Sequence, residues 1–574
     1  MTEENPSTPQ PPSFHIRTPA QGREVLAEGE HGYPTPGEQS PTVEGVMDDH
    51  FFVDDNAWNE VAAAAWDFIV VGSGHTALAF TQAALEKNPD ARILILERGP
   101  FWLTQHFQDT PLPFKYMLGG HSETFPWTLS KKTHENLVGY MHGSCPFFGG
   151  RSTFWSAWNP APSKQLMRNW PAALVNPTQE PGFWDRAKSL LNVIGADEIG
   201  DPIYEELQSQ LSPRLIGNFK QKVPSAQEAY DAPLAVRNPS SFDVRFKKFA
   251  VPGPMLALKE RQEKLGTGKL TIATRCVVEL LAGPTSGHVQ KLITSRGELP
   301  VGDAKVVLAA GAIPPATLLL NSYPQTMKLA GKRLTAHFLT HIAARVPRSA
   351  FSNLPDRLQI AAMYLAGMGK NKHQYHVQIT GISSPDPENE AVDAARECPD
   401  YAAAATPQQL ADSSDYVVFV CATLGELAEG NPENWVRPDE GKDPTTNVTL
   451  QVIPNAEDME LWDLMDEATL QTIAAMAGSG PVEYWNESAT NPGQGRWTTQ
   501  PPSEVERRIP GLVHEAGPVW MGESESDSVV GPDFRPWGIE NVYVTGGGLF
   551  PTSGSWNPTL TMCGLAQHLA DNLA

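Results

Sequence analysis

The segment that most constrains this chain is VVGSGHTA (residues 70–77), which joins an apolar run to a helix-forming run. The apolar run is FIVV, the helix-forming run is TALAFTQAALEKN, and RILILE (92–97) follows. This order of strand, glycine turn, helix and strand is typical of a βαβ unit with parallel strands. The sequence therefore predicts an α/β protein with a Rossmann-like lobe that starts near Trp66.

The glycine turn also predicts a dinucleotide site. Gly72 and Gly74 allow the backbone to approach a pyrophosphate, and Ala77 is small enough for the helix to lie close to the strand. The free N–H groups at the helix start would bind the phosphates. Glu97, at the end of the next strand, is predicted to accept hydrogen bonds from ribose hydroxyls, which disfavours a phosphorylated ribose; Arg98 is assigned to the same site. These features fit a flavin or a nicotinamide cofactor equally well.

Charge and cysteine content exclude several classes of partner. The 574 residues contain 43 Lys and Arg against 66 Asp and Glu, a net charge of -23 that repels nucleic acid and anionic membranes. The five cysteines have no zinc-ligand or redox-dithiol spacing, so we expect no metal site and a reducing compartment. The N-terminus resembles no secretory signal and no run of 18 apolar residues is present, which predicts a cytoplasmic protein without a membrane span.

Segments far apart in the sequence are predicted to build the same lobe. LTIATRCVVELLA (270–282), AKVVLAAGAI (304–313) and NVYVTGGG (541–548) are apolar runs of the kind found in buried parallel strands. The nucleotide lobe is therefore expected to be discontinuous. We expect an N-terminal arm over 1–65, nucleotide-lobe parts over 66–165, 241–325 and 504–574, and substrate-lobe parts over 166–240, which is helical, and 326–503.

The substrate lobe is predicted to contain a mainly antiparallel sheet with flanking helices. HIAARV, YHVQITGI, DYVVFVCATL and TNVTLQVI, within residues 340–383 and 415–455, are rich in β-branched and aromatic residues. The acidic segment 384–414, which contains Ala and Pro, is expected to be a loop between them.

Four segments together resemble the glucose-methanol-choline oxidoreductase family, and within it the pyranose oxidase branch. Besides the βαβ unit, they are FFGGRSTFWSAWNPAP (147–162), VLAAGAIPPATLLLNS (307–322), and the C-terminal pair HEAGPVWMG (514–522) and GGGLFPTSGSWNPTLT (546–561). The resemblance implies FAD as the cofactor and an alcohol as the substrate. Roughly the remaining two-thirds of the chain carries no match of this kind.

The resemblance assigns further residues to the flavin. Gly149 and Gly150 would let the backbone approach the isoalloxazine, and Ser152 and Thr153 would present N–H and hydroxyl groups to its polar edge. Pyranose oxidases have a histidine after this Thr that bonds covalently to the flavin, whereas this chain has Phe154, so a non-covalent FAD is expected. The other cofactor contacts implied are Val277, Ala310, Gly311, Gly547, Leu549, Pro558 and Thr559.

His514 and Asn557 are the expected catalytic pair. An imidazole with a pKa near neutrality accepts the hydroxyl proton, while the hydride passes to flavin N5. Asn557 lies where the family has His or Asn, and its amide would hold the substrate oxygen. His75 is expected to start a helix, and Cys145 to be an inert buried thiol. His121 and His142 are either flavin contacts or ordinary core or surface residues.

The predicted function is oxidation of an alcohol, with dioxygen or a quinone-like molecule as electron acceptor. The tryptophans near the motifs fit a sugar-like or aromatic substrate as well as they fit core packing. Two alternatives stay open at this point: a non-redox lyase or isomerase with the same fold, and a flavin-binding protein without activity. The sequence sets neither the substrate nor the oligomeric state.

Overall fold

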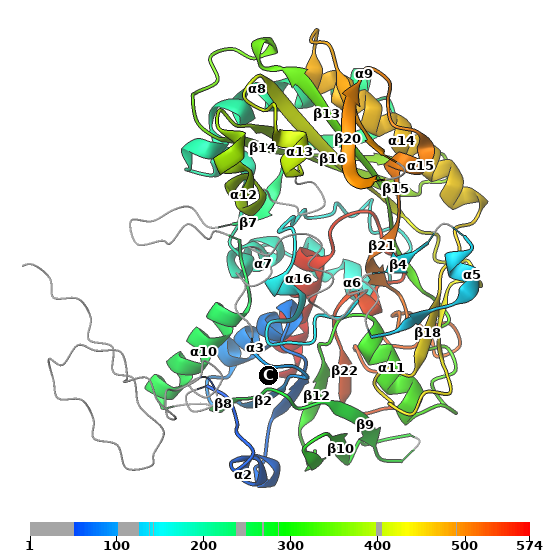
Figure 1. Ribbon diagram of the computed structural model, residues 1–574. Helices are drawn as coiled ribbons and strands as arrows, with labels where there is room; N and C mark the ends of the chain where they lie inside the picture. Colours follow the sequence, from blue (N-terminus) through cyan, green and yellow to red (C-terminus); the bar gives the residue numbers. More distant parts are fainter. Residues whose placement is uncertain are drawn as a thin grey trace, which may run out of the picture.

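The computed structural model describes Met47 and residues 51–101, 126–136, 138–141, 143–236, 248–266, 269–284, 286–397, 405–488 and 491–574. Two large sheets dominate this part of the chain. A parallel sheet lies in the lower half of Figure 1, and an antiparallel sheet lies above it. Residues of both sheets line one cavity.

The parallel sheet has five strands in the order β22-β12-β1-β2-β8. Each neighbouring pair is parallel, with Phe68 opposite both Lys305 and Ile93. Ile69 and Val70 are fully buried because helices cover the sheet. These strands confirm the predicted Rossmann-like, discontinuous lobe, since they come from three distant segments: β1 (Phe68–Val71), β2 (Arg92–Leu96), β8 (Lys269–Ala273), β12 (Lys305–Leu308) and β22 (Val542–Val544).

Two helices from opposite ends of the chain pack together on this lobe. They are α3 (His75–Lys87), which follows the glycine turn, and α16 (Thr559–Leu573), which ends the chain. Ala77, Ala83 and Ala84 of α3 are fully buried, and small side chains allow such close packing. The two helices lie side by side in Figure 1.

The antiparallel sheet has the main order β20-β19-β13-β16-β15-β14-β6, and β21 pairs with both β13 and β4. This confirms the predicted second, mainly antiparallel sheet. Its strands are β4 (Tyr140–Met141), β6 (Ala226–Asp231), β13 (Thr335–Pro347), β14 (Gln359–Met368), β15 (Gln374–Ser383), β16 (Tyr416–Glu426), β19 (Glu483–Ser488), β20 (Asn491–Thr498) and β21 (Arg508–Ala516).

Strand β13 separates two environments by the alternation of its side chains. Phe338 and Ile342 pack into a core with the long helix α14 (Ala456–Ala477). Leu339 and Ala343 point to the opposite face, where they line a cavity. The same alternation places His337 on the cavity side of β13.

The helical segment expected over 166–240 contacts both lobes. Helix α7 (Phe183–Leu191) packs on α16, whereas α8 (Glu206–Ile216) packs on β14 and α14. The residue boundaries of the lobes stay predictions.

Two expectations about strands were wrong in detail. The run 270–282 divides between β8 and β9 (Val278–Ala282), and β9 belongs to a separate sheet with β10 (Lys291–Thr294) and β11 (Gly297–Pro300). The division falls at Arg275, whose φ of 51° is incompatible with a continuous strand. TNVTLQVI forms β18 (Val448–Gln451), which pairs with β17 (Trp435–Pro438) and β3 (Thr128–Leu129) instead of joining the large sheet.

The segment expected to be a loop over 384–414 contains a helix. Helix α12 (Pro387–Glu397) begins with a proline, and Glu388 and Glu390 lie in its first turn. Proline fits the first turn of a helix, and carboxylates there interact favourably with the helix dipole. Residues 398–404 lie outside the described part of the chain.

The remaining short elements connect the sheets and cover their edges. Among the described residues, no helix is long and apolar enough to cross a membrane. The connecting elements are α2 (Trp58–Ala63), α5 (Lys131–His134), η2 (Gly150–Thr153), α6 (Ala172–Val175), η3 (Pro177–Gln179), β5 (Val193–Gly195), η4 (Ala196–Glu198), η5 (Pro202–Tyr204), α9 (Phe219–Lys222), β7 (Pro233–Ala235), α10 (Pro252–Leu265), α11 (Ile313–Ser322), η6 (Arg348–Ala350), α13 (Pro407–Leu410), α15 (Glu504–Arg507) and η7 (Gly547–Leu549).

Candidate active site

The glycine turn between β1 and α3 forms one end of the site. Gly72 has a φ of 101°, and a Cβ at this position would lie 2.7 Å from the carbonyl oxygen of Ala309. Gly74 immediately precedes α3. Because a side chain at Gly72 is sterically excluded, the turn stays tight and the first backbone N–H groups of α3 lie at the cavity.

Glu97, which follows β2, stabilises this turn by hydrogen bonds. Its Oε2 accepts hydrogen bonds from the backbone N–H of Ser73 at 3.1 Å and from the Ser73 hydroxyl at 2.5 Å, and its Oε1 accepts from the N–H of Gly99 at 2.9 Å. Burial raises the pKa of Glu97 to about 7 despite these bonds. Glu97 lines the cavity, and Oε1 has a second lone pair for a ribose hydroxyl. Ser73 was missed because the middle position of a GSG turn carries no pattern of its own.

The GGRST segment packs directly on the glycine turn. Gly149 donates its N–H to the Ser73 hydroxyl at 2.9 Å, and a Cβ at Gly150 would lie 3.4 Å from Cα of Gly74. Neither Ser152 nor Thr153 lines the cavity, and their assignment to the flavin stays a prediction. The Ser152 hydroxyl donates to the Gly149 carbonyl at 2.6 Å, and the Thr153 hydroxyl donates to the Gly150 carbonyl at 2.8 Å. Both hydroxyls therefore stabilise the turn.

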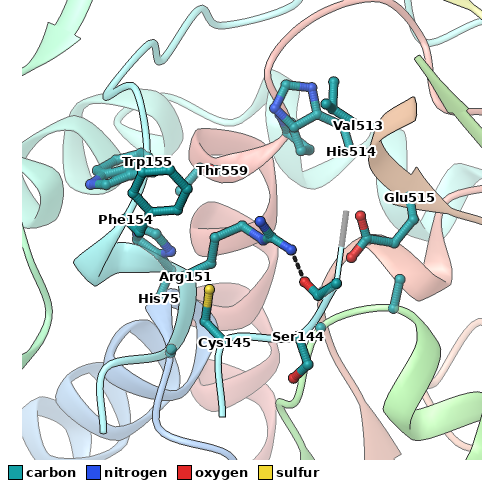
Figure 2. Close-up of a pocket in the computed structure, with 18 of the residues that line it drawn as sticks. His75, Ser144, Cys145, Arg151, Phe154, Trp155, Val513, His514, Glu515 and Thr559 are labelled. Carbon is teal, nitrogen blue, oxygen red and sulfur yellow. Dashed lines mark hydrogen bonds between the residues drawn. The ribbon is translucent and has the colours of Figure 1, made fainter. Parts of the chain in front are cut away.

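Arg151 is the residue of this segment that reaches into the cavity. Its guanidinium donates to the carbonyl of Gly143 (Figure 2). Burial raises the pKa values of Cys145 and Glu515, and the Arg151 charge opposes this increase. Burial, followed by the Arg151 charge, lowers the pKa of His75 to about 3, so this histidine is neutral. No pattern in the sequence pointed to Arg151, which stands at the variable position of the motif.

A second set of expected residues reaches the cavity from the C-terminal segment and from two strand ends of the parallel sheet. Gly547 lies in η7, and Pro558 and Thr559 lie at the start of α16. All three line the cavity, as do Val277, Ala310 and Gly311 from the loops that follow β8 and β12, and Arg98.

His514 reaches the cavity through an irregularity in β21. His337 pairs with Val513 and Thr335 pairs with Ala516, so three steps along β21 face two along β13. The extra residue is a β-bulge, in which His514 adopts a φ of 59°. A bulge re-aims a side chain, and this one brings His514 to the cavity wall (Figure 2).

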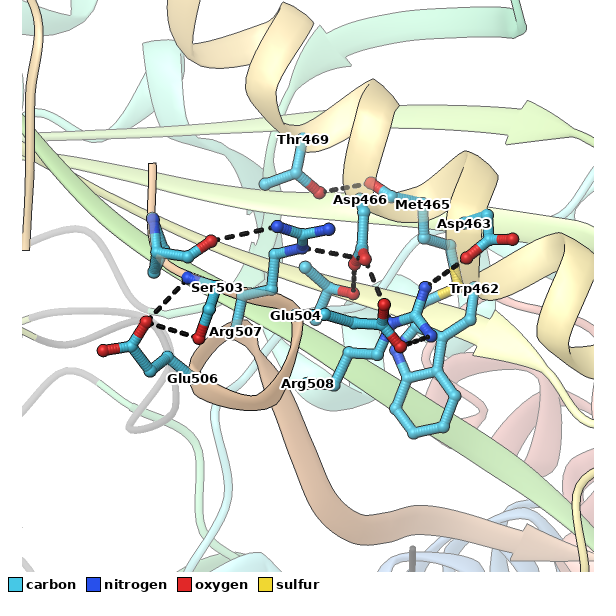
Figure 3. Close-up of polar contacts among 12 residues, drawn as sticks. Trp462, Asp463, Met465, Asp466, Thr469, Ser503, Glu504, Glu506, Arg507 and Arg508 are labelled. Atoms are coloured by element: carbon cyan, nitrogen blue, oxygen red, sulfur yellow. Dashed lines mark hydrogen bonds and ion pairs between the residues drawn. The ribbon is translucent and has the colours of Figure 1, made fainter. Parts of the chain in front are cut away.

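An ion-pair network fixes the first residues of β21 (Figure 3). Asp466 of α14 is buried and accepts from the Arg507 Nε at 2.8 Å, the Arg508 Nε at 3.0 Å and the Thr340 hydroxyl at 2.5 Å. Arg508 also pairs with Asp463 at 2.5 Å. Helix α14 thereby anchors the strand that carries His514.

Asn557 is oriented by a residue of β15. Gln378 donates from Nε2 to Oδ1 of Asn557 at 3.0 Å, and both side chains are buried. The Asn557 Nδ2 therefore keeps its two N–H donors for other partners. Gln378 was not predicted, although it lies within the YHVQITGI strand.

A single cavity of about 740 Å³ brings these parts together. It extends from the glycine turn to His514 and Asn557, so both predicted catalytic residues and most of the predicted cofactor residues line it. Five residues expected at the cofactor do not line the cavity: Ala77, Gly149, Ser152, Thr153 and Leu549. Ala77 of α3 and Leu549 of η7 are both buried in the hydrophobic core. His121 and His142 lie outside the described residues.

The lining of the cavity fits a bound dinucleotide. Nε2 of His75, at the start of α3, is buried without a hydrogen-bond partner, although His75 lines the cavity. A Cβ at Gly311 would meet no atom within 4 Å, which leaves open space beside the backbone. Gly72, Gly74 and Glu97 would hold the pyrophosphate and the adjoining ribose, and Pro558 and Thr559 would contact the flavin end.

The fold and this cavity define a two-lobed α/β protein with a Rossmann-like nucleotide lobe. Residues 431–566, which include His514 and Asn557, match the family model described as GMC oxidoreductase. This match covers the C-terminal part of the chain, and the family that it names is the glucose-methanol-choline oxidoreductases.

Similarity to known proteins is local in sequence and extensive in fold. The chain is 39% identical over 66 residues to a C-glycoside 3-oxidase of Microbacterium trichothecenolyticum, and 38% identical over 63 residues to one of Arthrobacter globiformis. These matches cover 11% of this chain and only 13% and 12% of the relatives. The solved structure of pyridoxine 4-oxidase from "Mesorbium loti" aligns with a TM-score of 0.55 and 16% identity, covering 88% of this chain and 99% of that one. At this identity the structural match establishes the fold alone.

Proposed function

We propose that this protein oxidises the CH–OH group of an alcohol with FAD as the hydride acceptor. The observation that carries this proposal is that His514, Asn557 and the glycine turn of residues 72–74 line the same cavity. The family match over residues 431–566 supports it. Bound FAD would supply the electrophilic nitrogen to which the carbinol hydride is transferred.

The chain itself supplies proton transfer and orientation. His514 takes the hydroxyl proton as the hydride leaves, and the resulting imidazolium stabilises the negative charge on the oxygen. Asn557 directs an N–H toward that oxygen, because its carbonyl oxygen is engaged by Gln378. One acceptor, His514, and one donor, Asn557, thus act on the same hydroxyl group. Together they orient the carbinol C–H bond toward the flavin.

The substrate side of the cavity favours a hydroxylated ring that carries an apolar group. Its wall combines Leu339, Leu424 and Trp485 with polar side chains that include Gln378 and His341. An apolar wall with a few convergent polar groups binds such mixed ligands. The relatives named C-glycoside 3-oxidase are consistent with a sugar-like substrate.

We further propose that the FAD is held without a covalent bond and that dioxygen or a quinone-like molecule reoxidises it. Phe154 lines the cavity at the position where pyranose oxidases have the linking histidine. A phenyl ring has no atom that can form the covalent bond that the histidine makes to the flavin.

Anaerobic stopped-flow spectroscopy tests the proposed reaction. A panel of alcohols, sugars and phenolic glycosides is screened for bleaching of the flavin, and the His514→Ala variant should bleach at least about 100-fold more slowly. His288→Ala, which alters a partly exposed histidine bonded to the Gly302 carbonyl and outside the cavity, is the matched control. Turnover without bleaching would instead indicate lyase or isomerase chemistry, and normal bleaching of His514→Ala would exclude His514 as the base.

A further inference from the structure

His337 is a buried histidine that the proposed reaction does not use directly. It lies on β13 opposite the bulge of β21, and its side chain is fully buried. Its Nδ1 lies 2.9 Å from Nδ1 of His514, with the ring planes at 81°. This is a hydrogen-bond distance, so one of the two nitrogens donates and the other accepts.

The backbone around His337 decides which nitrogen donates. The other ring nitrogen, Nε2, faces the carbonyl oxygen of Ser553 at 3.4 Å. A carbonyl oxygen only accepts, so the favourable tautomer of His337 carries its proton on Nε2. The Ser553 hydroxyl is bonded to the Ala336 carbonyl at 3.2 Å and to the Thr335 hydroxyl at 3.1 Å, which holds this carbonyl against β13.

His337 carries a single ring proton at neutral pH. Burial lowers the pKa of His337 to about 4, because a charged imidazolium is poorly solvated there. The ring of His376, from β15, lies edge-to-face against it at 6.2 Å and is itself buried, with a pKa lowered by burial. Because the proton is on Nε2, the Nδ1 atom of His337 carries a lone pair and can accept a hydrogen bond.

We propose that His337 is a positioning residue that holds His514 in the tautomer protonated on Nδ1. The lone pair on Nδ1 of His337 accepts a hydrogen bond from this N–H, so the basic lone pair of His514 is on Nε2. The Nε2 atom is then the one that takes the proton of the alcohol. The catalytic part of this inference rests on the proposed function, whereas the tautomer itself does not.

Three substitutions of His337 separate hydrogen bonding from packing. The amide oxygen of Asn lies near the position of imidazole Nδ1, so His337→Asn keeps an acceptor for His514. Gln reaches the position of Nε2, so His337→Gln keeps a group near Ser553 but loses that acceptor. His337→Leu removes both. Flavin content and thermal unfolding, measured for all three, show whether each variant is folded.

The first readout is the rate constant of flavin reduction under anaerobic conditions at saturating alcohol. We expect His337→Asn to retain most of the rate, and His337→Leu and His337→Gln to lose about 10-fold to 100-fold with little change in substrate affinity. Equal losses in all three folded variants would show that His337 acts only by packing and would overturn the proposal.

The second readout is independent of turnover. Nitrogen-15 NMR of the histidine-labelled holoprotein, with His514 assigned by loss of its signals in His514→Gln, reports which nitrogen is protonated. We expect Nδ1 in the wild type and His337→Asn, and a shift toward Nε2 in His337→Leu. A wild-type His514 protonated on Nε2 would overturn the tautomer assignment. If no alcohol bleaches the flavin, the proposed function fails while this measurement still decides the role of His337.

Discussion

Gln378 donates a hydrogen bond from its side-chain Nε2 to Oδ1 of Asn557 at 3.0 Å, across 179 positions of sequence. One residue comes from the antiparallel sheet and the other from the turn before α16. This contact gives the two ends of the Asn557 amide different roles. The carbonyl end is anchored, and the amino end is available to a substrate oxygen.

Replacing the donor end of Asn557 should impair the reaction. Asn557→Asp keeps an acceptor for Gln378 but puts a carboxylate oxygen where the N–H was, next to an oxygen that becomes negative. We expect flavin reduction to slow by about 100-fold to 1000-fold, the range for loss of one preorganised donor. Anaerobic stopped-flow measures it, and Asn557→His, which retains an N–H, is the comparison variant. Equal rates in Asn557→Asp and the wild type would exclude this role.

Phe154 leads to a prediction about the cofactor. Acid precipitation of the holoprotein should release all of the flavin into the supernatant, because a phenyl ring offers no atom for a covalent link. Absorbance of the supernatant and the pellet measures the distribution. Flavin colour that stays with the washed pellet would contradict the non-covalent proposal.

The Asp466 network should contribute strongly to stability. Asp466→Ala leaves the guanidinium of buried Arg508 without its interior partner, and we expect the free energy of unfolding to fall by about 3–5 kcal/mol. Asp463 also pairs with Arg508, but the Asp463 side chain is 73% exposed. The Asp463→Ala variant should therefore lower the free energy of unfolding by less than about 1 kcal/mol. Thermal and denaturant unfolding of the two variants test this difference. Equal losses of stability in the two variants would show that the buried ion pair between Asp466 and Arg508 does not hold β21 in place.

Glu97 should make the stability of the flavin-free protein depend on pH. The pKa of Glu97 is raised from 4.5 to about 7 by burial, so the folded chain binds more protons than the unfolded chain between these values. Stability from this group is therefore greatest below pH 4.5 and falls as the pH rises through about 7. The Glu97→Gln variant cannot ionise. Its stability relative to the wild type should rise by about 3 kcal/mol from pH 4.5 to pH 8, and a constant difference would contradict the shift.

The chain order of motifs was enough to predict the cofactor lobe. Gly72, Gly74, Glu97 and Gly311 line the cavity, and a strand followed by a glycine turn and a helix has few possible local structures. The hydroxyls of Ser152 and Thr153 could not be placed from the motif alone. A hydroxyl bonds to a nearby carbonyl as readily as to a ligand, and only the local turn decides between them.

The sequence by itself determined the Rossmann-like lobe and its discontinuity, since these depend on local patterns and on the order of motifs along the chain. It also predicted His514 and Asn557 as one site, and both line the same cavity. Only the tertiary structure decided the neighbours of those two side chains. His337 lies on β13, Gln378 on β15 and Asp466 on α14, and none of them belongs to a local pattern. Their positions depend on strand register and on a bulge in β21, which place residues more than a hundred positions apart in contact.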